Sequence, residues 1–244
     1  MKQAIFTLTE NEALTARFSR LRLRGDCSCI EEPGQFVSLS LPGFFLRRPF
    51  SVCDWDGDGF SLIVEQVGKG TALLRGLRPG TELDVLSGLG KGFDLRRAGA
   101  SPLLVGGGSG VSPLLGLARR LLERGAAPQV ILGFNTREDL ILLDDFFRLG
   151  LAPSVTTADG SFGLKGFVTA AMDRPHSFFY ACGPEAMLRA VCERSPVSGQ
   201  LSFDARMGCG FGACMGCTKM TRSGPRRVCK DGPVFDKEEL LWDD

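Results

Sequence analysis

The chain has 244 residues, and its 29 lysines and arginines nearly balance its 28 aspartates and glutamates, which gives a formal net charge of +1 at pH 7. A domain usually takes roughly 100–200 residues, so this length predicts more than one domain, and the balanced charge excludes a field that attracts nucleic acid or an anionic membrane. The first residues lack the pattern of a signal peptide, and no apolar run approaches the roughly 18 residues of a membrane span, so we expect a cytoplasmic protein.

From Ala4 to about Asp94, short apolar runs are separated by turn residues. This rhythm predicts an antiparallel β barrel, with a β sandwich as the alternative. The motif R-R-P-F-S offers Arg48 as a fixed cation and Ser51 as a hydroxyl donor, a pair suited to a pyrophosphate. The later motif G-K-G-T offers backbone amides and Thr71 at the start of a helix. Taken alone, the first motif also fits a solvated surface arginine and the second a plain turn.

From about Ser101 to Arg194, short buried strands alternate with amphipathic helices. This order predicts a parallel, doubly wound sheet. A glycine-rich turn joins the first strand to the first helix, where its amides and the helix N-terminus can receive a phosphate. The turn does not fit the G-x-G-x-x-G fingerprint, so a turn that binds no nucleotide stays an alternative. Its glycines are Gly106, Gly107, Gly108 and Gly110.

The C-terminal part of the chain concentrates four of the nine cysteines. Cys209, Cys214, Cys217 and Cys229 are spaced C-x4-C-x2-C-x11-C, and the first three match the plant-type [2Fe–2S] ligand run. Glycines between them suit a loop that turns its amides inward. The segment is too short for an apolar core of its own, so we expect a metal to supply stability. Structural zinc is the alternative, although the spacing lacks two C-x2-C knuckles.

Taken together, the motifs R-P-F-S, G-Q-F-V, L-G-K-G-F, G-G-G-S-G-V-S-P-L-L and C-G-P-E-A-M resemble the ferredoxin–NADP reductase superfamily. With C-G-F-G-A-C-M-G-C and V-C-K-D-G-P-V-F added, nearly the whole chain resembles the electron transfer subunits of NAD-dependent dihydroorotate dehydrogenases. The resemblance implies an FAD-binding β-barrel domain over residues 1–96, an NAD-binding α/β domain over 97–198 and a [2Fe–2S] segment over 199–244.

The resemblance also implies roles for individual residues. A core position without a ligand stays the alternative for Cys182. The FAD-binding residues would be Arg48, Pro49, Phe50, Ser51, Ile63, Val64, Glu65, Gly70 and Thr71. The NADH-binding residues would be Gly106, Gly107, Gly108 and Gly110 near the phosphates, and Cys182, Gly183 and Pro184 near the nicotinamide. The cluster ligands would be Cys209, Cys214, Cys217 and Cys229.

The implied function is electron transfer between NADH or NAD⁺, FAD and the [2Fe–2S] cluster, to or from a partner protein. In that family the partner is an FMN-containing dihydroorotate dehydrogenase catalytic subunit, in a heterotetramer of two copies of each chain. We expect no catalytic acid or base, because the cofactors carry the chemistry. Met207, Phe211 and Met215 beside the ligands are expected to contact the partner. The alternatives are a small subunit of a sulfide dehydrogenase or ferredoxin–NADP reductase type, and a non-catalytic module that holds zinc.

Overall fold

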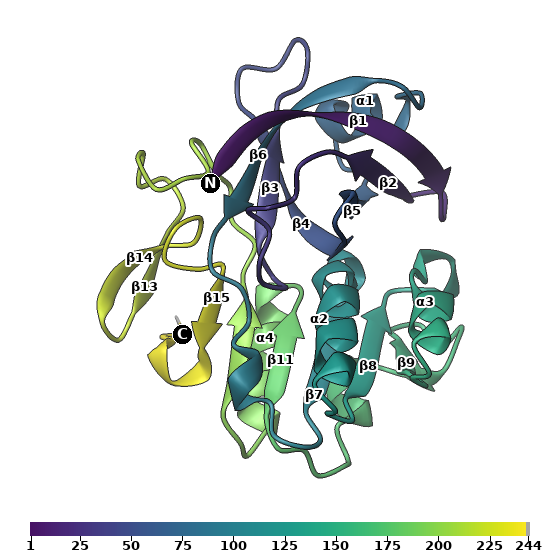
Figure 1. Cartoon of the computed structure of the whole chain (residues 1–244). Helices are drawn as coiled ribbons and strands as arrows, with labels where there is room; N and C mark the ends of the chain where they lie inside the picture. Colours follow the sequence, from purple (N-terminus) through teal and green to yellow (C-terminus); the bar gives the residue numbers. More distant parts are fainter. Residues whose placement is uncertain (243–244) are drawn as a thin grey trace.

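The computed structural model describes residues 1–242 as two β structures with a small hairpin beside them (Figure 1). The first is a closed barrel with the strand order β1-β2-β5-β4-β3-β6, and the second is a 7-stranded sheet with the order β10-β9-β8-β7-β11-β12-β15. The predicted fold class, an antiparallel barrel followed by a doubly wound α/β sheet and a small C-terminal segment, is confirmed. No helix within residues 1–242 is long and apolar enough to cross a membrane.

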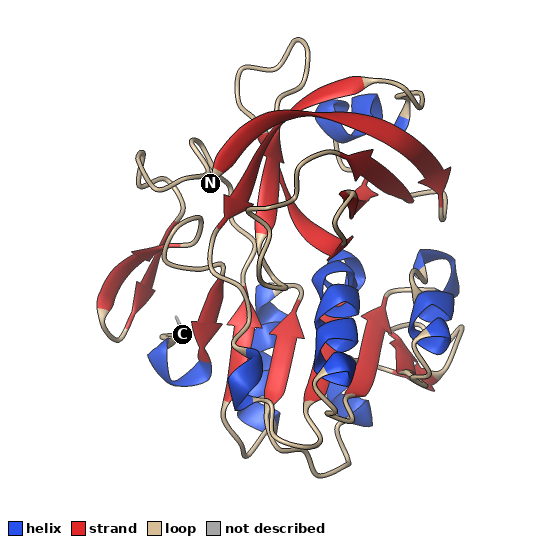
Figure 2. Cartoon of the chain, viewed as in Figure 1, coloured by secondary structure: helices blue, strands red, loops and turns tan. Residues whose placement is uncertain are grey.

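The barrel is antiparallel at every strand pair. Apolar side chains alternate along its strands, so that Phe6 and Leu8 of β1, for example, are fully buried inside it while their neighbours face outward. A short helix, α1, follows β5 at one end of the barrel (Figure 2). The elements are β1 (Lys2–Ala13), β2 (Phe18–Arg24), β3 (Phe36–Leu39), β4 (Arg48–Trp55), β5 (Gly59–Glu65), α1 (Lys69–Arg75) and β6 (Glu82–Leu89).

Helices cover both faces of the second sheet. Tyr180 of β11 packs in one core cluster with Leu117 of α2, whereas its neighbours Phe179 and Ala181 pack in another with Leu188 of α4. Since successive strand residues point to opposite faces, α2 and α4 lie on opposite sides of the sheet. The elements are β7 (Leu103–Gly107), α2 (Ser112–Glu123), β8 (Gln129–Phe134), α3 (Leu143–Arg148), β9 (Ser154–Thr157), β10 (Leu164–Lys165), β11 (Phe179–Cys182) and α4 (Glu185–Arg194), with single 3₁₀ turns between several of them.

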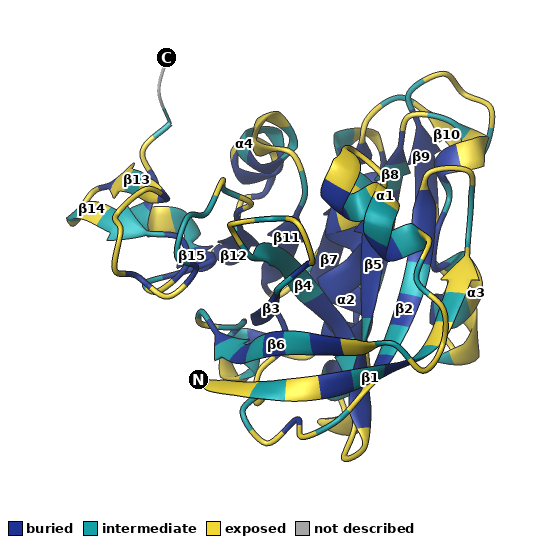
Figure 3. Cartoon of the chain, turned by 90° about the horizontal axis from the view of Figure 1, so that it is seen from above, coloured by how far each residue is buried: buried dark blue, intermediate teal, exposed yellow. Residues whose placement is uncertain are grey.

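The C-terminal segment is built into the second sheet. Its strand β12 pairs in parallel with β11, and β15 pairs antiparallel with β12. Phe203 and Phe235 pack in the same core cluster as α4, so the segment gains stability from this packing as well as from any metal. The hairpin of β13 and β14 projects from the sheet, and most of its residues are half-buried or exposed (Figure 3). The strands are β12 (Gly199–Ser202), β13 (Thr218–Thr221), β14 (Gly224–Arg227) and β15 (Val234–Asp236).

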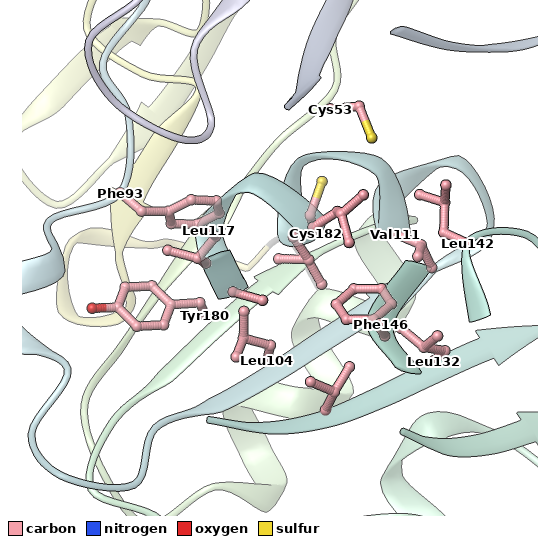
Figure 4. Close-up of a cluster of buried hydrophobic side chains, with 14 of the residues drawn as sticks. Cys53, Phe93, Leu104, Val111, Leu117, Leu132, Leu142, Phe146, Tyr180 and Cys182 are labelled. Atoms are coloured by element: carbon pink, nitrogen blue, oxygen red, sulfur yellow. The ribbon is translucent and has the colours of Figure 1, made fainter. Parts of the chain in front are cut away.

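The barrel and the α/β sheet share one apolar core. Ile63 and Cys53 from the barrel belong to the same buried cluster as Val111 and Cys182 from the sheet, and Figure 4 shows the thiol-bearing side chains of Cys53 and Cys182 at this junction. Helix α2 lies so close to β4 that a Cβ built on Gly116 would fall 2.8 Å from the carbonyl oxygen of Cys53. The shared core therefore fixes the barrel against the carboxyl ends of the parallel strands.

Candidate functional site

The two phosphate-compatible motifs of the barrel lie next to each other. Arg48 begins β4 and Gly70 lies in the first turn of α1, where a Cβ on Gly70 would fall 3.1 Å from the Arg48 Nε. The Arg48 guanidinium stacks over the Phe44 ring at 4.9 Å, and its Nη1 donates to the Leu46 carbonyl at 2.8 Å. These contacts orient a cation beside the backbone of G-K-G-T, as an anion site requires.

Thr71 shapes the G-K-G-T turn from within. Its hydroxyl accepts hydrogen bonds from the amides of Val67 and Gly68 at 2.9 and 3.1 Å and donates to the Gly68 carbonyl. The family resemblance implies that Thr71 binds FAD. The structure gives its hydroxyl a local task, which is to hold the turn that brings Gly70 to Arg48.

The remaining barrel positions differ in what they present. Pro49, Phe50 and Ser51 are half-buried, and Phe50 packs against the barrel core. The side chain of Val64 is enclosed inside the barrel with Leu74, so a ligand outside the barrel meets only its backbone.

The side chains of Ile63 and Glu65, on either side of Val64 in β5, point away from the barrel interior. Ile63 points the opposite way, into the core shared with the α/β sheet. Glu65 forms an ion pair with Arg17, which also reaches Asp139 beyond β8 at 3.2 Å. The carboxylate of Glu65 therefore helps to join the barrel to the α/β sheet.

The two motifs assigned to NADH, the glycine turn after β7 and the C-G-P motif after β11, meet at one point of the second sheet. A Cβ built on Gly110 would fall 2.3 Å from the Cys182 carbonyl oxygen and 2.6 Å from the Gly183 nitrogen. A Cβ on Gly107 would fall 3.3 Å from Pro184 Cδ. The turn after β7 and the turn after β11 are thus in direct backbone contact, although the sequence separates them widely.

The contact between the two turns lies where the strand order of the sheet reverses. In the order β10-β9-β8-β7-β11-β12 the chain builds outward from β7 on one side and then continues with β11 on the other. The carboxyl ends of β7 and β11 are therefore the switch point of the sheet, where such folds bind nucleotides. Gly106 and Gly108 belong to the same turn, and Gly108 has a positive φ of 55°.

Cys182 ends β11 at this switch point, and its thiol is buried. Burial raises the pKa of Cys182 to about 12, so the thiol is neutral at physiological pH. Its side chain belongs to the core shared by the two β structures, while its carbonyl borders Gly110. A core role and a place beside the nucleotide site are therefore compatible.

The four C-terminal thiols form two pairs. The Cys209 amide donates to the Cys214 Sγ at 3.5 Å, and the amides of Ala213 and Cys214 donate to the Cys209 Sγ at 3.2 and 3.4 Å. In the second pair the Cys229 amide donates to the Cys217 Sγ at 3.4 Å. The structure thus arranges the four cysteines that the spacing singled out as two pairs, Cys209 with Cys214 and Cys217 with Cys229.

The pKa values of Cys209, in the first pair, and Cys229, in the second pair, are shifted in opposite directions. Although desolvation raises the pKa of Cys209, hydrogen bonds from the amides of Cys214, Phe211 and Ala213 lower it to about 6. Burial and the adjacent Cys217 raise the pKa of Cys229 to about 12. A cation between the pairs would stabilise every thiolate, since metal ligands must be deprotonated.

The arrangement fits two irons better than one zinc. Within residues 1–242, no three or more His, Cys, Asp or Glu side chains form one group that could hold a metal ion, so the four thiols are not gathered as a tetrahedral zinc site requires. A [2Fe–2S] cluster needs two thiolates at each iron, which two separate pairs provide. Gly208 lets the loop pass close to the Cys214 Sγ without crowding it. A Cβ on Gly208 would fall 3.2 Å from that sulfur.

One residue near the thiols escaped the sequence analysis. Arg227, at the end of β14, donates from Nη1 to the Gly212 carbonyl at 2.9 Å and from Nε to Asp231 at 3.1 Å. It therefore joins the loop of the first thiol pair to the turn after the second. No local pattern marks an arginine for such a role, because the partner carbonyl lies in a distant part of the chain.

Two clefts in the described part of the chain lie away from the residues assigned to the cofactors. One of about 740 Å³ opens between the barrel and α2 and is lined by Trp55, Arg119 and Glu123, among others. A second of about 720 Å³ is lined by Lys91, Arg96 and Asp236, among others. No residue that the sequence analysis assigned to a cofactor lines either cleft.

Comparison with known proteins agrees with this geometry. Residues 204–241 match the family described as the iron-sulfur cluster binding domain of dihydroorotate dehydrogenase B, and residues 104–193 match the oxidoreductase NAD-binding domain. The dihydroorotate dehydrogenase B (NAD(+)) electron transfer subunit of Geobacillus sp. (strain WCH70) is 40% identical over 258 residues, which cover 99% of this chain and 99% of the relative. That of Bacillus velezensis is 39% identical over 98% of this chain and 99% of its own length.

Solved structures resemble the whole architecture. The NADH-dependent reduced ferredoxin-NADP oxidoreductase structure studied for flavin-based electron bifurcation is 29% identical, with a TM-score of 0.87 over 98% of this chain and 90% of that one. A ferredoxin NADP+ reductase from Neisseria gonorrhoeae with bound FAD and NADP shares the fold, with 19% identity and a TM-score of 0.67 over 80% of this chain and 90% of its own length.

These findings define an NAD-linked oxidoreductase subunit that uses FAD and a [2Fe–2S] cluster and passes electrons onward. The identity over nearly full length is more specific than the fold. The chain belongs to the family of dihydroorotate dehydrogenase B electron transfer subunits. The residues assigned to each cofactor and the boundaries after residues 96 and 198 remain predictions.

Proposed function

We propose that this chain carries electrons between NADH and a catalytic subunit that oxidises dihydroorotate, in pyrimidine biosynthesis and in the cytoplasm. The observation that carries the proposal is the pairing of the four thiols in a chain that matches the named electron transfer subunits over 99% of its length. When bound, FAD exchanges hydride with NADH and the [2Fe–2S] cluster exchanges single electrons.

The protein's own part is to hold these groups in order. We assign the nucleotide to the switch point, where the amides around Gly110 and Gly183 are available to phosphates and nicotinamide. Arg48 and the turn held by Thr71 would bind the FAD pyrophosphate from the barrel. We assign residues 1–96 to FAD, 97–198 to NAD and 199–244 to the cluster. The buried core between barrel and sheet excludes water from the junction.

The proposed partner is an FMN-containing catalytic subunit, in a heterotetramer of two copies of each chain. The relatives' name, electron transfer subunit, requires a catalytic partner. Phe211 and Met215 beside the thiols are 44% and 50% exposed, so they suit an apolar contact surface. The expectation for Met207 changes, because it is half-buried and packs against the core of the second sheet.

The test is to co-purify the chain with the catalytic subunit encoded in the same organism and to measure dihydroorotate-dependent reduction of NAD⁺. We expect a complex that contains FAD, FMN, iron and sulfide and that catalyses this reaction, while neither subunit alone does. A complex that never forms, from two subunits that each fold and hold their cofactors, would refute the assignment of the partner.

A second candidate is a small subunit of the ferredoxin-NADP oxidoreductase type. It is favoured by the TM-score of 0.87 to the bifurcating enzyme, which exceeds the TM-score of 0.67 to the reductase from Neisseria gonorrhoeae. NADH-driven reduction of ferredoxin or NADP⁺ without any response to dihydroorotate would support this candidate instead.

A further inference from the structure

Arg227 bridges the two halves of the cluster-binding segment. Its Nη1 donates to the Gly212 carbonyl at 2.9 Å, between the first two cluster cysteines. Its Nε donates to Asp231 Oδ2 at 3.1 Å, and the same oxygen accepts the Arg227 amide at 2.9 Å. Asp231 therefore fixes the guanidinium, which in turn fixes the peptide of Gly212.

Gly212 connects the loop of the first thiol pair to the turn after the second. It has a φ of 94°, and a Cβ on it would fall 2.6 Å from the Lys230 side chain, so only glycine fits there without strain. Lys230 directly follows Cys229 in the chain. The peptide that Arg227 holds therefore lies against the residue next to the last cluster cysteine.

The charge of Arg227 also lies near the thiols. Its Nη1 is held 2.9 Å from the Gly212 carbonyl, in the loop between Cys209 and Cys214, and Arg227 itself lies two residues before Cys229. A positive charge at this place favours the more negative, reduced form of a cluster, and charge and hydrogen bonds to sulfur set reduction potentials.

The neighbouring arginine provides an internal comparison. Arg226 precedes Arg227 in β14, and successive strand residues point to opposite faces. Its Nη2 lies 3.5 Å from Ser223 Oγ, within its own hairpin. Arg226 therefore carries the same charge on the same strand but contacts its own hairpin turn.

We propose that Arg227 is a positioning residue for the [2Fe–2S] cluster, which locks the loop of Cys209 and Cys214 against Cys217 and Cys229 and raises the reduction potential of the cluster. The inference rests on the proposed function in one respect, namely that these four thiols hold the cluster. The planar guanidinium donates from Nη1 and Nε in fixed directions, which suits a bridge between two separated acceptors, whereas a lysine ammonium is a compact charge on a flexible stem without this fixed fork.

The experiment compares Arg227→Gln, Arg227→Lys and Arg226→Gln in the full chain, produced with its FAD and cluster. The readouts are iron and sulfide content, the rate of cluster bleaching in air, and the midpoint potential in an anaerobic dye titration. FAD content and NADH-driven flavin reduction report folding, since the FAD and NAD motifs lie on other elements.

We expect both Arg227 variants to lose the cluster about 10- to 100-fold faster than the wild type, as is typical when support around a metal site is removed. Arg227→Gln should also have a lower midpoint potential than Arg227→Lys, which keeps the charge. Arg226→Gln should match the wild type in cluster lifetime. Equal lifetimes in all three variants would overturn the inference.

Two further results separate the possible failures. If Arg227→Gln does not fold, Asp231→Asn loosens the same clamp while the arginine remains, and a wild-type cluster lifetime in that variant would overturn the inference. A wild-type protein that holds zinc, or no metal, would refute the proposed cluster itself. A stable wild-type cluster that is indifferent to Arg227 would refute only the role of this residue.

Discussion

Gly110 lies against Cys182 more closely than any other residue type allows, since a Cβ on Gly110 would fall 2.3 Å from the Cys182 carbonyl oxygen. The contact joins the turn after β7 to the turn after β11 at the switch point of the sheet. Glycine is required here for close approach of two backbones rather than for an unusual φ. The two motifs assigned to NADH are therefore one structural unit.

Gly110→Ala should break this unit. The added methyl group must push the two turns apart, which costs about 1–3 kcal/mol of stability and displaces the nucleotide site. A displacement of about 1 Å can cost about 100-fold in rate, so we expect a loss of that order in NADH-driven flavin reduction. Stopped-flow absorbance measures this rate. Gly57→Ala, in a turn with no atom within 4 Å of the added Cβ, should behave as the wild type; equal rates in both variants would contradict the prediction.

Arg48→Gln should weaken FAD binding. A charge-assisted hydrogen bond to a pyrophosphate contributes about 1.5–3 kcal/mol, which corresponds to about 10- to 150-fold in the dissociation constant. Fluorescence titration of the FAD-depleted protein with FAD measures the effect. The control is Arg78→Gln, which removes an exposed arginine outside the motif. An unchanged affinity in Arg48→Gln would remove the arginine from the FAD site.

Sequence patterns predicted those features that depend on local spacing. The cysteine spacing marked four thiols that the structure arranges as two pairs, and the glycine turn and the C-G-P motif follow the adjacent strands β7 and β11. Spacing cannot encode which side of a strand faces a shared core, so the inward side chain of Val64 and the packing of Met207 became evident only in three dimensions. Arg227 depends on the Gly212 carbonyl, which the cysteine loop before β13 supplies, and such pairings leave no signal in one sequence.

Cys214→Ser should remove the cluster and leave the flavin. Cys214 is exposed and its hydrogen bonds are with Cys209 of the same loop, while the FAD motifs lie on β4, β5 and α1, so we expect the barrel motifs to be unaffected. We expect the iron–sulfur absorption and the iron content to disappear, while FAD stays bound and NADH still reduces it. Cys29→Ser, which removes a half-buried thiol outside the segment, serves as control. Loss of flavin reduction in an FAD-replete Cys214→Ser protein would contradict the proposed electron order.

The buried thiols should make the protein less stable at high pH. Burial raises the pKa of Cys53 and of Cys182 from 9.0 to about 12. Above pH 9 the unfolded chain therefore releases protons that the native state retains. The stability contribution is complete below pH 9 and falls by about 1.4 kcal/mol per pH unit for each thiol, until the native thiols ionise near pH 12.

Urea unfolding between pH 8 and pH 10.5, followed by tryptophan fluorescence, measures this slope. Cys53→Ala removes one of the titrating thiols, so its slope above pH 9 should be about 1.4 kcal/mol per pH unit smaller than that of the wild type. Val52→Ala, at the preceding buried position of β4, also removes buried volume but no titrating group. It should lower the free energy of unfolding by a similar amount at every pH. If Cys53→Ala kept the full wild-type slope, the thiol would not be the source of the pH dependence, because the cavity alone leaves that slope unchanged.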